Sequence, residues 1–333
     1  KATNSNYPDD IEGMGVLGSC LRLNNYIEEG LVVLNRAISI NPSYAEAYLN
    51  RGLIRLAINK KESALEDLQK TYSLKPHLKV IWDTIISLKI ENKQFIETIS
   101  FLKELLKLEP NNEKILVIKG QCYKQLSQFD FAIKSYKKAI EINGNSAEAY
   151  GNLGLVLSMI DELDDAIVNF KYALSLDPVD SVIHYSLGNA EQKKGDYVSA
   201  INSYKKAIDI NPEYIEAHNN LGESFTKLDN WTAALKSFAN AVSINFEYAE
   251  AHFNLGNAQK ELGLFEDSKL SLHQAIALNP KFAEAHHILG ELFYIEGNLK
   301  AAIQSIEKAV EIKPKSKVFR LFLNIFNARK TKA

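Results

Sequence analysis

The sequence predicts an all-α fold made of nine consecutive copies of a 34-residue unit that folds as two helices. Aligned in blocks of 34 from Ile11, eight of nine blocks have glycine at position 8, and only Ile86 departs from the column. Proline occupies position 32 in seven blocks, and Pro8 is the only proline outside that register. Within each block, apolar residues recur along one helical stripe, which predicts helices rather than strands.

This register divides the chain without gaps. Residues 1–10 are polar and are expected to form a leader or linker. Residues 317–333 are expected to form a C-terminal capping helix on the last repeat. Between them lie the nine predicted repeats: 11–44, 45–78, 79–112, 113–146, 147–180, 181–214, 215–248, 249–282 and 283–316.

Each block is expected to form a helical hairpin, meaning a first helix, a tight turn and a second helix. The turn is expected near position 15, because the residues there tolerate a left-handed backbone: Asn25, Asn59, Asp161, Gly195, Asp229, Gly263 and Gly297. The second helix carries a small residue at position 20, a large one at 24 and usually alanine at 27, and the proline at 32 ends it. Glycine at 8 facing these alanines lets the two helices approach closely.

Repeat 3 breaks this pattern. Ile86, Thr98 and Leu105 replace the small residues at positions 8, 20 and 27. Bulkier side chains at these contact points are expected to spread the two helices and to change the pitch of the array locally.

The residues at positions 4, 7, 8, 20, 24, 27 and 32 together resemble the tetratricopeptide repeat (TPR). The runs Ala147–Gly154 and Glu216–Gly222 are especially regular, and resemble the arrays attached to O-GlcNAc transferases and many bacterial repeat proteins. The resemblance implies a right-handed α–α superhelix, a TPR solenoid, in which the first helix of each repeat lines a concave groove.

Composition argues against several classes of partner and location. The formal charge is −2, whereas nonspecific nucleic-acid binding needs a basic surface. No apolar run is long enough to span a membrane. Cys20 and Cys122 are the only cysteines, which favours a reducing, cytoplasmic location. Because the chain begins at Lys1 and not at Met, a targeting segment ahead of it stays an open alternative.

No catalytic, cofactor or metal site is expected. The glycines from Gly13 to Gly18 match a nucleotide-binding spacing, but they lie inside a predicted helix and not after a strand. His184, His218, His252 and His286 recur every 34 residues, too far apart for one metal ion, and are expected to be packing residues. We therefore expect a protein that is not an enzyme.

The resemblance places positions 2, 5, 6, 9, 12 and 13 in the groove, and repeats 5–9 offer the most polar set there. The candidate peptide-binding residues are Asn152, Tyr185, Asn189, Lys193, Asn219, Asn220, Glu223, Lys227, Phe253, Asn254, Asn257, Lys260, His287 and Glu291.

A ladder of asparagines can pair with the backbone of an extended peptide, because each amide offers a donor and an acceptor. The alternative is that asparagine at position 6 serves packing and solubility. Acids outnumber bases in the groove columns, and no repeat has Lys or Arg at position 5, so the expected ligand is a neutral or basic segment.

The capping helix has too many apolar residues for one face. We expect Phe319, Phe322 and Phe326 to form an apolar interface, either with a second copy of the chain or with a downstream domain. The predicted function is a scaffold that binds an extended segment of a protein partner. Two alternatives stay open: the substrate-recruiting array of a larger enzyme such as a glycosyltransferase, and an assembly protein that uses its ends or convex face.

Overall fold

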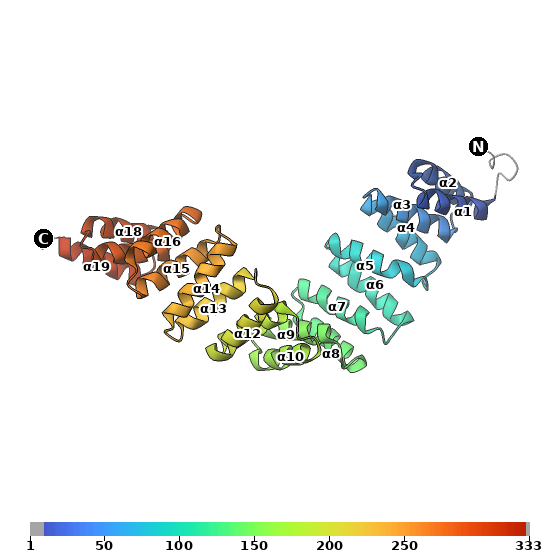
Figure 1. Cartoon of the computed structure of the whole chain (residues 1–333). Helices are drawn as coiled ribbons and strands as arrows, with labels where there is room; N and C mark the ends of the chain where they lie inside the picture. Colours follow the sequence, from blue (N-terminus) through green and yellow to red (C-terminus); the bar gives the residue numbers. More distant parts are fainter. Residues whose placement is uncertain (1–9, 331–333) are drawn as a thin grey trace. The chain divides into compact units, whose positions relative to one another are not determined.

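A computed structural model describes residues 10–330 of the protein, and within them all regular structure is helical. The predicted leader, apart from Asp10, and the last three residues of the predicted capping helix lie outside the described residues. The chain divides into two compact units, Lys1–Gly144 and Asn145–Ala333. In both units, pairs of helices follow one another along the chain (Figure 1).

The first unit holds four helical hairpins, one for each of the first four blocks. Its helices are α1 (Ile11–Leu23), α2 (Ile27–Ile40), α3 (Ala45–Ala57), α4 (Lys61–Leu74), the 3₁₀ helix η1 (Lys79–Ile81), α5 (Trp82–Glu91), α6 (Phe95–Leu108), α7 (Glu113–Gln125) and α8 (Phe129–Ile142).

The second unit holds five hairpins and a final single helix. Its helices are α9 (Ala147–Met159), α10 (Leu163–Leu176), α11 (Ser181–Lys193), α12 (Tyr197–Ile210), α13 (Ile215–Thr226), α14 (Trp231–Ile244), α15 (Ala249–Glu261), α16 (Phe265–Leu278), α17 (Ala283–Ile295), α18 (Leu299–Ile312) and α19 (Lys317–Lys330). Within each unit, the second helix of one hairpin packs on the first helix of the next.

The predicted turn at position 15 is confirmed in all nine hairpins. Every residue there has a positive φ, including Lys93 (57°) and Ser127 (56°), which composition alone did not single out. Glycine, asparagine and aspartate adopt this left-handed backbone readily, whereas Lys93 and Ser127 adopt it because the flanking helices fix the turn.

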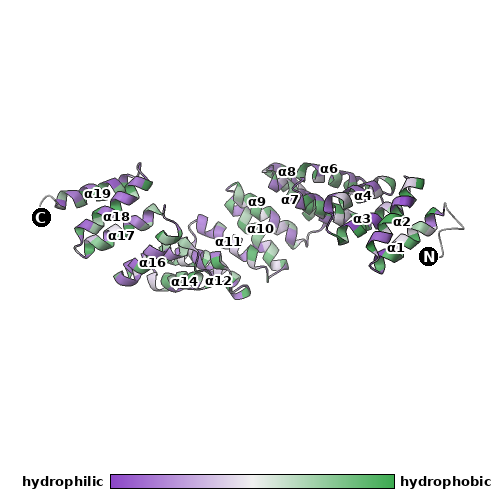
Figure 2. Cartoon of the chain, turned by 90° about the horizontal axis from the view of Figure 1, so that it is seen from above, coloured by the Kyte–Doolittle hydropathy of each residue, from purple (hydrophilic) through white to green (hydrophobic). Residues whose placement is uncertain are grey.

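The glycine at position 8 allows close packing, as expected, but its neighbour is the large residue at position 24. A Cβ added to Gly120 would lie 2.4 Å from the Tyr136 ring, and one added to Gly222 would lie 2.5 Å from Phe238. Phe238 also joins a core cluster with residues of the next hairpin. One large side chain therefore closes its own hairpin and joins it to its neighbour. Figure 2 shows that hydrophobic and hydrophilic residues are mixed along the helices of both units.

Repeat 3 is irregular, as the sequence predicts. Its first helix begins with the 3₁₀ turn η1, and α5 and α6 approach each other over a shorter stretch than the helices of the other hairpins. Ile86 and Leu105 are nevertheless buried, so the bulkier side chains fill the added space. The predicted change in pitch stays a prediction.

The ring at position 4 joins neighbouring hairpins through the backbone. The Nε2 atoms of His184, His218 and His252 lie 3.1, 3.0 and 2.9 Å from the carbonyl oxygen of position 32 in the preceding repeat. Trp82 donates its indole N–H to the equivalent oxygen of Pro76 at 3.0 Å. The recurring histidines are therefore packing residues that also hydrogen-bond the loop between repeats.

Candidate functional site

The first helices of the second unit bring several of the predicted groove residues together. We call the surface formed by positions 2, 5, 6, 9, 12 and 13 of α9, α11, α13, α15 and α17 the inner face. Side chains on it contact one another across neighbouring repeats, which are 31 to 35 residues apart in sequence.

One group of contacts centres on Asn189. Its Oδ1 accepts hydrogen bonds from Tyr204 at 2.7 Å and from Asn220 at 2.9 Å. Asn220 Nδ2 also lies 3.3 Å from the Tyr185 hydroxyl, and the Tyr185 ring packs 4.8 Å from that of Tyr214. The group borders a hollow of about 420 Å³ lined by Ser158, Met159, Asn189, Gln192, Lys193 and Asn220.

A second group holds the carboxylate of Glu223 among amides. Asn219, only 1% exposed, donates to Glu223 Oε1 at 2.9 Å, and Asn254 donates to Asn219 Oδ1 at 3.0 Å. Burial raises the pKa of Glu223, and the nearby Glu250 raises it further. No lysine or arginine among the described residues forms an ion pair with Glu223, so its charge is met by amide donors alone.

A third group lies where the inner face meets α19. Lys260 Nζ lies 2.8 Å from Glu291 Oε2, so these two charges neutralise each other within the chain. His287 Nε2 stands 3.6 Å from Glu291, and its ring packs 5.0 Å from Phe319 and 4.7 Å from Phe322. The His287 side chain is 14% exposed, so its main contacts are with α19 and little of it is open to a ligand.

The remaining predicted residues make separate contacts. Asn152 donates to the Glu148 carbonyl of its own helix at 3.0 Å, Phe253 packs 4.6 Å from Phe282, and Lys193 lies 3.5 Å from Asp161. Lys227 is exposed and Asn257 is half-buried. The predicted residues thus form three local groups and isolated positions, not one continuous ladder.

The prediction for α19 was right about two apolar faces and wrong about which residues face outward. Phe319 and Phe326 are 6% and 1% exposed, and Phe326 stacks on Tyr294 at 4.6 Å. The outward stripe is Val318, Leu321 and Ile325, which are 53%, 57% and 41% exposed. The phenylalanines occupy positions 3, 6 and 10 of a further block, and positions 3 and 10 of complete repeats pack on the preceding hairpin.

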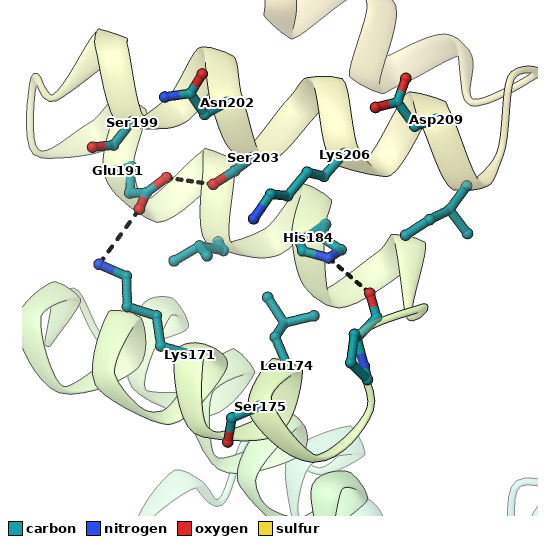
Figure 3. Close-up of a pocket in the computed structure, with 13 residues that line it drawn as sticks. Lys171, Leu174, Ser175, His184, Glu191, Ser199, Asn202, Ser203, Lys206 and Asp209 are labelled. Atoms are coloured by element: carbon teal, nitrogen blue, oxygen red, sulfur yellow. Dashed lines mark hydrogen bonds and ion pairs between the residues drawn. The ribbon is translucent and has the colours of Figure 1, made fainter.

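Sequence reasoning did not find a polar hollow on the opposite side of the hairpins. We call the space between the second helices of neighbouring repeats, floored by a first helix, the outer groove. Between α10 and α12 it forms a hollow of about 620 Å³ (Figure 3). Glu191 on its floor is 4% exposed and accepts a 2.7 Å hydrogen bond from Ser203, with Lys171 Nζ at 3.9 Å.

The signal for this site lies at positions 11 and 23 of the repeat. Arg55 and Asp67, Glu191 and Ser203, and Gln259 and Ser271 occupy these positions in three hairpins, and each pair is in contact. Position 11 is leucine or an aromatic residue in five repeats, and a polar residue there has a polar partner at position 23 in three of the other four; repeat 3, with Lys89 and Phe101, is the exception.

Residues 10–330 show neither a metal-binding cluster nor a membrane span. No three His, Cys, Asp or Glu side chains in that range converge as metal ligands. No helix in it has both the length and the apolar character needed to cross a bilayer.

Comparison with protein families matches much of the chain to repeat models. Models described as TPR repeat match residues 120–160, 188–229 and 222–263, and models described as tetratricopeptide repeat match residues 45–78 and 253–317. These matches fall in both units.

The individual proteins that resemble this chain share 30% of its residues or fewer over the aligned part. Rat sperm-associated antigen 1 is 30% identical over 116 residues, which cover 34% of this chain and only 12% of that protein. YrrB, described as a TPR protein with an unusual peptide-binding site, is 27% identical, with 60% of this chain and 99% of YrrB covered and a TM-score of 0.52. A TPR protein from Cytophaga hutchinsonii is 17% identical, with 72% and 98% of the chains covered and a TM-score of 0.60.

Proposed function

Because this chain belongs to the tetratricopeptide-repeat proteins, whose fold supports protein-interaction scaffolds, we propose that it holds an extended segment of a partner protein on its inner face. The binding region comprises α11, α13 and α15. The work of the protein is affinity and positioning, without bond making, in the cytoplasm.

The observation that carries this proposal is the set of amides around Glu223. The half-buried Asn254 amide is already oriented by its contacts with the buried Asn219 and with the Glu223 carboxylate, so little of its side-chain entropy is lost on binding. Glu223 has no cation beside it, and Glu250 adds a second negative charge. A neutral or basic segment therefore fits this region, whereas an acidic one is repelled.

The hollow beside Asn189 and Asn220 supports the same location. It adjoins the aromatic pair Tyr185 and Tyr214, which offers an apolar surface next to hydrogen-bonding groups. YrrB, a TPR protein with an unusual peptide-binding site, shares the repeat architecture over 60% of this chain. That likeness supports the class of ligand, while the residues named here come from this chain.

Selection from a random peptide display library tests the proposal with the full chain as bait. We expect enrichment of peptides rich in lysine or arginine and poor in acids. The double variant Asn189→Leu with Asn220→Leu should lose their binding, and Glu223→Gln should weaken the preference for basic peptides. Asn240→Leu, at an exposed position of the second helix α14, is the matched control.

If the library yields no binding peptide, or if peptides bind the double variant and Asn240→Leu equally well, the inner face is not the binding surface. Melting curves of the variants establish that any loss is not due to unfolding.

We also propose that the chain self-associates through the outward stripe of α19. Val318, Leu321 and Ile325 expose three apolar side chains on one helical face. Leu321→Lys should shift a dimer to a monomer in sedimentation velocity, with Phe322 and its inward contacts unchanged. A wild-type chain that stays monomeric at high concentration contradicts this second proposal.

A further inference from the structure

Lysine or arginine side chains recur in the outer grooves. In the grooves of repeats 2 and 6, a carboxylate in the same groove forms an ion pair with them. In the groove of Figure 3, Lys171 and Lys206 line the same hollow as the buried Glu191. These residues occupy positions 25, 26 and 11 of their repeats.

The groove of repeat 2 is neutralised more completely. Arg51, at position 7, and Arg55, at position 11, lie 2.6 and 2.8 Å from the carboxylate oxygens of Asp67. Arg51 also donates to Asn35 at 2.7 Å. Asp67, at position 23, is 2% exposed, so two cations and one anion share a desolvated site within the chain.

Repeat 4 has the cations without a carboxylate at position 7, 11 or 23. Lys119 takes position 7, which is leucine in six of the nine repeats, and position 23 is Ser135, whose hydroxyl donates to the Phe131 carbonyl at 2.8 Å. Its charged neighbours are Lys103 on α6 and Lys134 and Lys138 on α8. Among the described residues, none of these four lysines forms an ion pair. Glu141, the equivalent of Asp209 in Figure 3, lies farther along α8.

The electrostatics of Lys119 follow from these neighbours. Burial lowers the pKa of the Lys119 ammonium, and Lys103, Lys138 and Lys134 lower it further. A half-buried cation whose charged neighbours are all cations is destabilising, unless an anion from outside the chain completes the groove.

An exposed aromatic ring borders the same lysine. Lys119 Nζ lies 5.9 Å from the centre of the Tyr123 ring, and Phe131 stacks on Tyr123 at 5.2 Å. Phe131 is 56% exposed, which leaves an apolar contact beside the charges. The surface therefore combines charge with one hydrophobic anchor, a combination suited to a protein segment.

We propose that the outer groove of repeat 4 binds an acidic segment of a partner protein, whose carboxylates meet Lys103, Lys119, Lys134 and Lys138 while an apolar side chain packs on Phe131. A protein is favoured over a nucleic acid for two reasons. The patch contains lysine and no arginine, which is the better bidentate ligand for phosphate, and the chain as a whole carries a charge of −2. This surface differs in place and in charge preference from the inner face of the second unit.

The test is fluorescence anisotropy with labelled octaglutamate as the probe and the full chain as the receptor. We expect binding that weakens as salt rises from about 50 to 300 mM. Ser135→Asp supplies an internal anion in the manner of Asp67, and Lys119→Leu restores the common residue of position 7. Each should weaken binding by about tenfold or more. Neither variant should unfold at a lower temperature than wild type, because Ser135→Asp compensates the positive charge and Lys119→Leu removes part of it.

Lys236→Ala is the matched control, because Lys236 is exposed at the same repeat position as Lys134 but in repeat 7. It should leave binding unchanged, whereas Lys134→Ala should weaken it. The proposal is overturned if octaglutamate does not bind at low salt, or if Ser135→Asp and Lys119→Leu bind it like wild type. It is also overturned if octauridylate RNA binds at least as tightly as octaglutamate and responds to the same variants.

Discussion

Asp67 in the first unit and Glu191 in the second are both carboxylates buried inside a helical hairpin, and their surroundings are opposite. Asp67 is held by two arginines at 2.6 and 2.8 Å, whereas Glu191 has a serine hydroxyl at 2.7 Å and an ammonium only at 3.9 Å. Positions 7, 11 and 23 face one another in the hairpin, so a charge at one of them has a close ion-pair partner when another of them supplies it. Without such a partner, burial shifts the pKa towards the neutral form: the pKa of Glu191 is raised and that of Lys119 is lowered.

The largest effect is expected at Asp67. Asp67→Ala leaves two arginines without their anion and should lower the free energy of unfolding of the first unit by about 3–5 kcal/mol. Urea titration of a Trp231→Phe background measures it, because Trp82 then reports on the first unit alone. The triple variant Arg51→Leu, Arg55→Leu, Asp67→Ser removes all three charges and should recover most of the loss. Equal damage in the single and triple variants would refute the pairing explanation.

A smaller effect of opposite sign is expected at Glu191. Burial raises the pKa of this carboxyl, so the folded state binds its proton more tightly than the unfolded state. Its contribution to stability therefore falls as pH rises from the ordinary value of 4.5 through the raised one, and the cost is complete at neutral pH. Glu191→Gln should stabilise the second unit by about 1 kcal/mol at pH 7, and less in acid. A loss of stability at pH 7, read from Trp231 in a Trp82→Phe background, would show that Glu191 is adequately paired.

The smallest effect concerns the ring at position 4. Burial lowers the pKa of His184, so the unfolded state takes up a proton first as pH falls. Stability is then lost as pH drops below 6.5 towards the lowered pKa. His184→Tyr, which introduces the residue found at that position in repeats 2 and 5, should make the second unit less sensitive between pH 7.5 and 5.5. If both proteins show the same pH profile, His184 does not contribute. Repeats 1–4 have no histidine at position 4, so the first unit is the internal reference.

The regular features of the fold followed from periodicity, because they depend on one repeated packing rule. Position 8 of repeat 7 is Gly222, beneath Phe238, and eight of the nine blocks have a glycine there, while the turn at Asp229 has its equivalent in all nine, so the aligned blocks reveal both features. The contacts that occur in only one or two repeats could not be predicted from the periodicity. The burial of Glu223 among Asn219 and Asn254 depends on two neighbouring repeats at once.

The error at α19 has a similar cause. The sequence of a single helix shows that two of its faces are apolar. Which face is buried depends on the preceding hairpin, where Tyr294 and His287 contact the phenylalanines of α19. Likewise, the polar hollow around Glu191 requires pairing position 11 with position 23, and a search along one helix does not make that comparison.

The rings that hydrogen-bond the preceding loop bear on how the array comes apart. Each bond from His218 to Pro212, or from His252 to Phe246, ties a hairpin to the backbone just before it, so opening one hairpin loosens the start of the next. Such nearest-neighbour coupling makes unfolding spread along a unit like a zipper. A repeat that lost its ring would become the preferred breaking point under mechanical tension, and pulling the chain between its ends would locate it.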